Sequence, residues 1–178
     1  MIAEADTNVS PKSHTRKPDK SQAAPLTGEE ATRIPPLESL TGFLLRCASN
    51  IADASYYKQL GNAEITPRQL AILLSLQNGG PMTQAALSAV TRMDRSTINE
   101  MVPRMIERDL INKTNSPDDK RSLHLSITVQ GLKALKGVLP ATVLSQDHVL
   151  AALPKEYRRI FKHCLEMIIE ANEAALSK

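Results

Sequence analysis

The feature that most constrains the fold is a strict alternation of apolar and polar residues over 123–129, the pattern of a strand with one buried face. Its apolar members are Leu123, Leu125, Ile127 and Val129. A partner strand is predicted at 110–114, because residues 115–121 between them (NSPDDKR) supply turn chemistry and two cations. The sequence therefore predicts a β-hairpin with a charged tip.

Two capped helices are predicted immediately before this hairpin. Thr83 is a suitable N-cap for a short supporting helix over 84–90, whose Ala85-Ala86-Leu87 face is small enough for close packing. After a turn, Asp94 can cap a second helix with an apolar inward stripe at Ile98, Met101, Val102, Met105 and Ile106. The residues predicted to face outward are Arg95, Ser96, Asn99, Glu100 and Pro103.

Helix, turn, helix and hairpin in this order predict a winged helix-turn-helix fold that reads DNA. Exposed Arg, Ser, Thr and Asn at a helix N-terminus can enter a major groove, where Asn pairs with adenine and Arg with guanine. At the hairpin tip, Arg121 would contact phosphate or the minor groove. The alternative interpretation is an ordinary solvated helix face and hairpin tip, or a winged helix used only for protein contacts.

Charge does not decide between these interpretations. The whole chain carries a formal net charge of +3, and residues 92–121 hold seven basic and six acidic side chains. We expect the acidic side chains to cap helices and to orient arginines, and not to face phosphate. Asp119 is the best candidate to hold an arginine in place near the hairpin tip. The DNA-binding hypothesis therefore rests on the order of the elements.

Composition predicts a single domain built mainly from packed helices. The chain has 178 residues with 3% aromatics and no Trp, which indicates a core of aliphatic side chains. Cys47 and Cys164 lie in apolar helical patterns without ligand spacing, so we expect no disulfide framework, metal site or cofactor. The sequence contains no phosphate loop or nucleophile motif, which argues against an enzyme. Without a signal pattern or an apolar run of about 18 residues, we expect a cytoplasmic protein and no membrane partner.

The flanking segments are predicted to be a tail and dimerisation helices. Residues 1–36 are polar and Pro-rich, so we expect a disordered tail. A helix is predicted from Leu37 to about Leu60, with apolar positions at Leu37, Leu40, Leu44, Cys47, Ala48, Ile51 and Ser55. Thr66, followed by Pro67, is expected to cap a helix with Leu70, Leu73, Leu74 and Leu76 turned inward.

Thr128 should cap a long helix that Pro140 kinks near Lys136 and that ends at Leu153-Pro154. The last helix is expected to bury Tyr157, Ile160, Phe161, Cys164, Leu165, Ile168, Ala171 and Ala175. These apolar faces are larger than the winged helix-turn-helix of residues 63–130 needs for its own core, so we expect segments 37–62 and 131–178 to form a homodimer interface. All three segments belong to one predicted domain of residues 37–178.

The sequence resembles the multiple antibiotic resistance regulator (MarR) family from about Leu37 to the C-terminus. The matching stretches are Ile65-Thr66-Pro67-Arg68-Gln69-Leu70, Asp94-Arg95-Ser96-Thr97-Ile98, Arg108-Asp109-Leu110-Ile111, Asp118-Asp119-Lys120-Arg121, Leu125-Ser126-Ile127-Thr128 and Gly131. The resemblance implies a triangular homodimer that reads adjacent major grooves of a near-palindromic duplex, with half-sites about 34 Å apart. The DNA contacts expected on this basis are Thr83, Gln84, Arg95, Ser96, Thr97, Asn99, Arg104, Asp119, Lys120 and Arg121.

Two positions depart from the family pattern. Asp109 stands where Gly is common, which is acceptable because Asp can adopt the left-handed region. Pro103 lies inside the predicted recognition helix and should bend it, so the contacts before Pro103 are the firmer ones.

The resemblance also implies a repressor that releases DNA when it binds a small aromatic acid. Arg46 occupies a position where related proteins place a carboxylate-binding Arg, and a guanidinium can hold a carboxylate with two hydrogen bonds. The effector contacts predicted with it are Ser49, Asn50, Tyr57 and His148, although a packing or surface role stays open for each. The alternative mechanism within the family is oxidation sensing by Cys47, which would need exposure and a cationic neighbour.

Overall fold

The computed structural model describes residues 35–61, 65–115 and 123–172, and the chain divides into two units, residues 1–40 and 41–178. In the first unit, a single 3-10 turn covers Leu37–Ser39, where both Ser39 N and Ser39 Oγ donate to Pro36 O. Leu40 is extended, so the prediction of a helix starting at Leu37 is wrong and α1 begins at Thr41. The local hydrogen bonds to Pro36 close a tight turn in place of a helical one. Of the predicted tail over 1–36, residues 1–34 lie outside the described residues.

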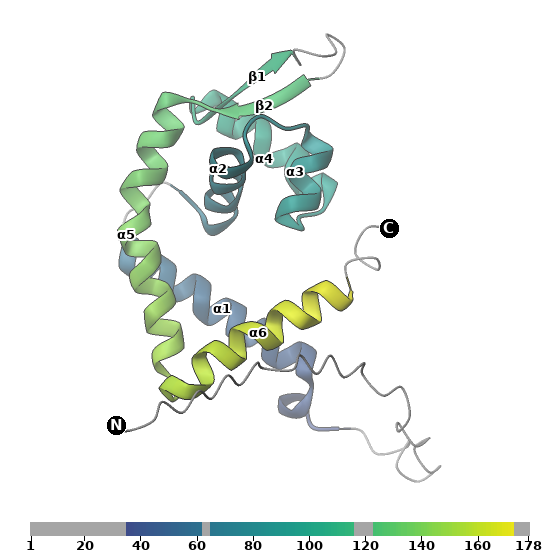
Figure 1. The fold of residues 1–178 in the computed structure, drawn as a ribbon, viewed down its shortest axis with the longest axis vertical. Helices are drawn as coiled ribbons and strands as arrows, with labels where there is room; N and C mark the ends of the chain where they lie inside the picture. The colour runs from purple at the N-terminus through teal and green to yellow at the C-terminus, as the bar shows by residue number, and fades with distance from the viewer. Residues whose placement is uncertain (1–34, 62–64, 116–122, 173–178) are drawn as a thin grey trace, which may run out of the picture. The chain divides into compact units, whose positions relative to one another are not determined.

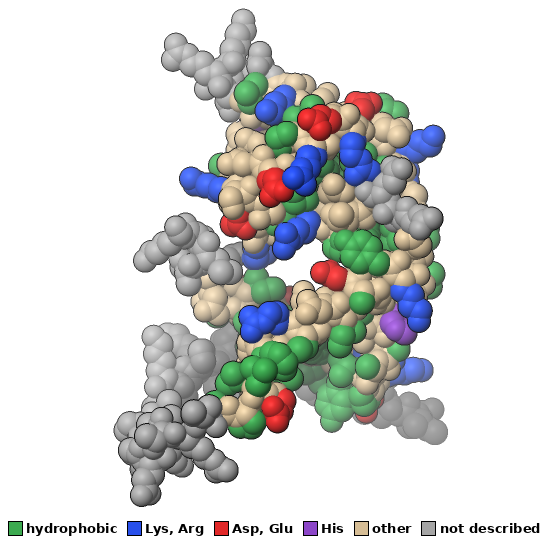
Figure 2. Space-filling view, turned by 180° about the vertical axis from the view of Figure 1, so that it is seen from behind, with side chains coloured by type: hydrophobic (Ala, Val, Ile, Leu, Met, Phe, Trp, Pro, Cys, Tyr) green, Lys and Arg blue, Asp and Glu red, His purple; other side chains and the backbone are tan. Residues whose placement is uncertain are grey.

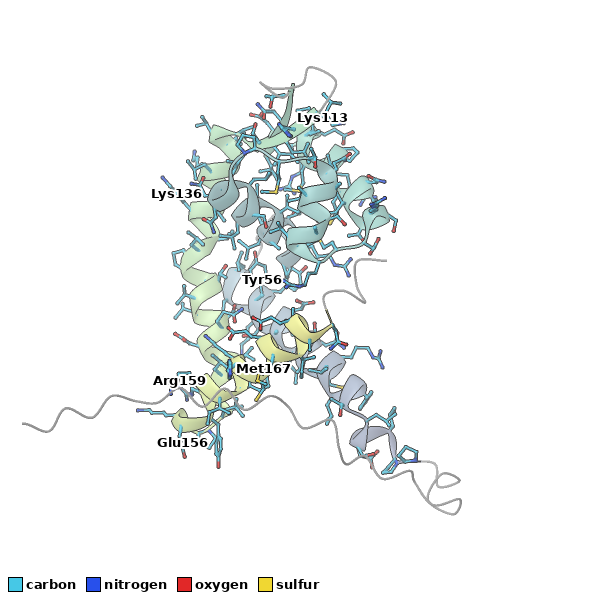
Figure 3. All side chains as sticks on the ribbon, turned by 45° about the vertical axis from the view of Figure 1, so that its right-hand side comes forward. Tyr56, Lys113, Lys136, Glu156, Arg159 and Met167 are labelled. Carbon is cyan, nitrogen blue, oxygen red and sulfur yellow. The ribbon has the colours of Figure 1, made fainter. Side chains whose placement is uncertain are left out.

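The second unit begins with a long helix that packs on a helix far along the chain. Helix α1 spans Thr41–Leu60 and lies against α5, which spans Val129–Ala151 (Figure 1). At their contact, the buried Ser55 Oγ donates to Ser145 O over 3.3 Å. Tyr56, on the same helix, is also buried, and its hydroxyl donates to Ile65 O at the start of the helical core (Figure 3). Helix α1 is thus fixed to α5 and to the core.

The core forms where three short helices meet the hairpin and α5. Helix α2 spans Pro67–Gly79 and begins with the predicted Thr66 cap, which the structure shows as a reciprocal capping box with Gln69. Ile72, which the sequence analysis did not assign to the core, is completely buried beside Leu73. The other buried apolar residues are Tyr56, Ile65, Leu70, Leu76, Leu87, Ile98, Val102, Met105, Leu110, Ile111, Leu125, Leu135 and Val138.

Helices α3 (Gln84–Thr91) and α4 (Arg95–Glu107) form the predicted helix-turn-helix. Both predicted caps are present: Thr83 Oγ1 accepts from Ala86 N, and an Asp94 carboxylate oxygen accepts from Thr97 N. The turn between the helices is possible because Arg92 takes a left-handed conformation with φ 54°. Of the predicted Ala85-Ala86-Leu87 packing face, only Leu87 is buried, so the prediction was wrong for the two alanines, which are exposed.

The hairpin pairs β1 (Ile111–Asn115) with β2 (Leu123–Ile127) in antiparallel register, Ile111 opposite Ile127. The predicted buried face is only partly correct, because Leu125 is buried, Leu123 is 54% exposed, and Val129 is the first residue of α5 and 88% exposed. No pattern in the sequence predicted that Met82 pairs with Leu125 through two backbone hydrogen bonds of 2.8 and 3.1 Å. This bridge ties the segment before α3 to the hairpin.

A close backbone contact joins the end of α4 to the start of α5. Asp109 adopts the left-handed conformation predicted for it, with φ 52°. Thr128, the confirmed cap of α5, donates its hydroxyl to Asp109 O and its N–H to Leu110 O. Gly131 then packs so closely that a Cβ built there would lie 1.9 Å from Leu110 O. The end of α4 and the start of α5 therefore meet in one closely packed junction.

The last helix, α6, spans Lys155–Ala171 and contains no buried residue. The side chains that the sequence predicted to be buried on α6 are exposed or half-buried in the single chain, because no element among the described residues packs extensively on that face. Their predicted packing against another subunit stays a prediction. Its large exposed apolar side chains are Tyr157, Ile160, Phe161, Met167, Ile168 and Ile169. Ala175 lies outside the described residues. Figure 2 shows hydrophobic side chains gathered over the helices at the bottom of that view.

Candidate nucleic-acid interface

The start of α4 is organised by one carboxylate. Asp94 caps the helix, and its two oxygens accept from Ser96 Oγ, from Thr97 N at 2.8 Å and from Thr97 Oγ1 at 2.7 Å. The Ser96 and Thr97 hydroxyl protons are therefore both directed at Asp94. Within this arrangement, the outer sides of these hydroxyls can offer only oxygen lone pairs to a ligand.

The same contacts set the charge of Asp94. The Ser96 hydrogen bond, followed by those from Thr97, holds the pKa of Asp94 well below its ordinary value of 3.8. A lowered pKa in the folded state means that this carboxylate stabilises the fold above pH 3.8, and that the contribution is lost as the pH falls through the lowered pKa. The cap is therefore fully charged at neutral pH.

The outward face of α4 carries the side chains predicted to read DNA. Arg95 and Asn99 are exposed one turn apart, as the sequence predicted. Arg104 is also exposed, but Arg104 Nη2 lies 2.8 Å from Glu100 Oε1 in an ion pair. Arg104 is thus already paired with an acidic side chain, whereas Arg95 and Asn99 stand before Pro103 near the capped start of the helix. Helix α4 continues unbroken through Pro103.

A hollow of about 200 Å³ lies between the first turn of α3 and the first turns of α4. Gln84 and Ala85 line it from α3, while Arg95, Ile98 and Asn99 line it from α4. Thr83, another predicted DNA contact, is occupied as the cap of α3. Ala85 and Ile98 were predicted to pack inward and not to line a site. The hollow arises because the N-terminal turns of α3 and α4, which a three-residue turn over 92–94 connects, meet in space.

The predicted contacts at the hairpin tip, Asp119, Lys120 and Arg121, lie outside the described residues. The described part of the hairpin presents the exposed Lys113 on β1 (Figure 3). Lys and Arg side chains are interspersed with Asp and Glu over the upper part of the molecule in Figure 2, in line with the nearly balanced charge of residues 92–121.

The predicted effector residues fall on two helices. Arg46, Asn50 and Tyr57 are exposed and recur at helical spacing along one face of α1, with the exposed Ser49 at its edge. Ser55, which meets α5, lies two residues from Tyr57 and so about 200° around the helix. The face that carries Arg46 therefore turns away from α5, and the exposed His148 of α5 is not brought to it.

Neither cysteine forms a disulfide: Cys47 is half-buried on α1 and Cys164 is exposed on α6. Among the residues that the structure describes, no three His, Cys, Asp or Glu side chains gather where they could hold a metal ion. Within the same residues, no helix is both long and apolar enough to cross a lipid bilayer.

Comparison with known proteins assigns the family. The MarR family model matches residues 65–123, which run from the start of the helical core to the hairpin. The organic hydroperoxide resistance transcriptional regulator of Bacillus subtilis is 31% identical over 138 residues, covering 76% of this chain and 94% of the relative. The chain belongs to the MarR family. A second relative, the transcriptional repressor NicR of Pseudomonas putida, is 28% identical over 134 residues, covering 75% of this chain and 85% of NicR.

Solved MarR-family structures share the fold. A probable transcriptional regulator from Pseudomonas aeruginosa is 34% identical, with a TM-score of 0.69 over 75% of this chain and 100% of its own. The repressor CouR, bound to a 23-mer DNA duplex, has a TM-score of 0.68 at 23% identity over 76% and 96% of the two chains. Bordetella bronchiseptica BpsR, whose DNA binding is regulated by 6-hydroxynicotinic acid, has a TM-score of 0.71 at 19% identity over 76% and 97%. This MarR-family chain is thus a winged-helix transcriptional regulator.

Proposed function

We propose that this regulator is a homodimeric repressor that binds a near-palindromic duplex site and leaves it when a small aromatic carboxylate binds. The observation that carries the DNA-binding part is the start of α4, where Arg95 and Asn99 project from a turn fixed by the Asp94 cap. Preorganised Arg and Asn side chains at a helix N-terminus are suited to read guanine and adenine edges. CouR, which shares the fold, has been solved on DNA.

The dimer is supported by the uncovered apolar face of α6. Tyr157, Phe161, Cys164 and Ile168 recur at spacings of four, three and four, which places them along one side of the helix. A continuous apolar face of this kind marks a protein interface. We assign the interface to segments 37–62 and 131–178, and DNA reading to residues 63–130, within a single domain of residues 37–178. The two copies would then present their α4 helices to half-sites about 34 Å apart.

DNA reading is tested first by selecting preferred sites from randomised duplexes with the full chain, and then by gel shift. We expect Asn99→Ala to weaken binding to the selected site about 5- to 150-fold and to reduce discrimination at one base pair per half-site, because an amide-to-adenine pair is lost. The matched control is Asn78→Ala, an exposed Asn on α2 outside the hollow, which should bind normally. Equal loss in both variants, or no selected sequence, would contradict DNA reading by α4.

Release by an aromatic carboxylate is supported by the polar face of α1, where Arg46 and Asn50 lie beside Tyr57, and by the behaviour of BpsR. The probe is 6-hydroxynicotinate, with benzoate as a second aromatic acid, added to the gel shift. We expect Arg46→Gln to raise the concentration that releases DNA about 10- to 100-fold, because a charge-assisted pair of hydrogen bonds is lost. Arg68→Gln, the same change at an exposed position of α2, is the control and should leave release unchanged.

The same assay separates the oxidation-sensing alternative. If both acids leave the complex intact, while hydrogen peroxide releases DNA from the wild-type protein and not from Cys47→Ser, the carboxylate proposal fails. Cys47 then carries the regulation. This alternative is worth testing because the chain is 31% identical to an organic hydroperoxide resistance regulator.

A further inference from the structure

The hollow between α3 and α4 has a composition that selects among the chemical groups of a DNA major groove. Its apolar surface comes from Ala85, which is exposed, and from Ile98, which is 1% exposed and so forms the floor. Its polar groups are the amides of Gln84 and Asn99 and the guanidinium of Arg95. An occupant should therefore join a small apolar group to a hydrogen-bond acceptor.

Phosphate does not suit this position. A helix N-terminus attracts phosphate when its N–H groups are available, but at α4 the Asp94 side chain already accepts from Thr97 N and from both neighbouring hydroxyls. The charged Asp94 also places a negative group beside the opening of the helix. A neutral base edge meets neither obstacle.

Thymine is the base that fits. In the major groove, thymine alone presents a methyl group, and this C5-methyl stands next to the O4 acceptor. The volume of about 200 Å³ is several times the ~30 Å³ share of one water molecule in the liquid, so a base edge can enter and not only a methyl group.

We propose that this hollow receives the major-groove edge of one thymine in each half-site, with its methyl group against Ala85 and Ile98 and its O4 accepting from the Gln84 side-chain amide, which leaves Arg95 and Asn99 to guanine and adenine. The inference rests on the proposed DNA reading by α4 and adds its base preference. Ala85, a residue without a functional group, becomes a determinant of sequence specificity.

Sites selected from randomised duplexes provide the first test, and uracil substitution provides the second. The selected sites should share a fixed thymine in each half-site. Replacing that thymine by uracil removes only the methyl group and should weaken binding roughly three- to tenfold, whereas uracil at the other thymines should have little effect. A specific site with no fixed thymine, or without any methyl-sensitive thymine, overturns the thymine inference and leaves DNA reading by α4 standing. If no specific site is selected, the proposed function itself fails.

A variant assigns the effect to the hollow. Ala85→Leu fills it from an exposed position, so the protein should fold, bind the selected site more weakly and no longer distinguish thymine from uracil. Ala89→Leu, an equal change at another exposed position of α3 that does not line the hollow, should keep the full thymine preference. An unchanged uracil penalty in Ala85→Leu would place the methyl contact elsewhere and overturn the assignment. Circular dichroism of both variants verifies that they are folded.

Discussion

Replacing Gly131 with alanine is expected to lower the free energy of unfolding by about 3 kcal/mol. The added Cβ would lie 1.9 Å from Leu110 O and 2.9 Å from Leu110 C, and neither backbone atom can move away by changing a rotamer. The backbone around Leu110 is also held by its own hydrogen bonds, from Leu110 N to Met105 O and from Thr128 N to Leu110 O. Relief therefore requires α5 to separate from the end of α4, and urea unfolding at fixed protein concentration measures the cost.

Gly137 provides the matched control on the same helix. A Cβ built there meets nothing within 4 Å, so Gly137→Ala should gain stability by roughly 0.5–1 kcal/mol from the higher helix propensity of alanine. The two identical substitutions in α5 should thus have opposite signs. If Gly131→Ala were also neutral or stabilising, the close junction between Leu110 and α5 would not exist in solution.

The sequence could predict the helix starts because their signals are local. Thr66, Thr83, Asp94 and Thr128 each cap a helix as expected, since the side chain and the N–H that it accepts from lie within three residues. The left-handed conformation at Asp109 was predictable for the same reason, as it depends on residue type and position in a turn. Local chemistry of this kind does not require knowledge of the tertiary fold.

Features for which local signals compete, or which depend on distant contacts, were predicted less well. The alternation of apolar and polar residues assigned Val129 to the strand, but Thr128 caps α5 and Val129 is the first residue of that helix. The 3-10 turn at Leu37–Ser39 interrupted a helical pattern that looked continuous in the sequence. Apolar spacing on α6 identified an apolar face correctly, but it could not show that no described element of the same chain packs extensively on it.

The candidate site likewise has features that the sequence could predict and features that it could not. Helical spacing was enough to place Arg95 and Asn99 on the outer face of α4. It could not show that Asp94 takes up the hydroxyl protons of Ser96 and Thr97, because that depends on rotamers. Nor could it reveal the hollow, which exists only where α3 and α4 meet, and to which Ala85 contributes by being small.

Placing a charge on the apolar face of α6 is expected to separate the proposed dimer. Ile168 is 47% exposed in the single chain and lies on the side of the helix that carries Phe161 and Cys164. Ile168→Asp would bury an unpaired carboxylate in each subunit of a dimer, at a cost of several kcal/mol per ion, so the dimer dissociation constant should rise more than 100-fold. Sedimentation velocity measures the association state directly.

Loss of the dimer should also weaken DNA binding. A monomer holds one half-site, and losing the second tethered contact typically costs 10²- to 10⁴-fold in affinity, so Ile168→Asp should bind the selected site at least 100-fold more weakly. Ile168 is not one of the described core residues, so the thermal unfolding of the α2–α4 core should remain cooperative. Lys162→Gln, which changes the charge by the same amount about 120° around α6 from Ile168, should remain dimeric and bind normally. A dimeric Ile168→Asp protein would show that α6 is not at the interface, and a monomer with full DNA affinity would show that reading the site needs only one copy.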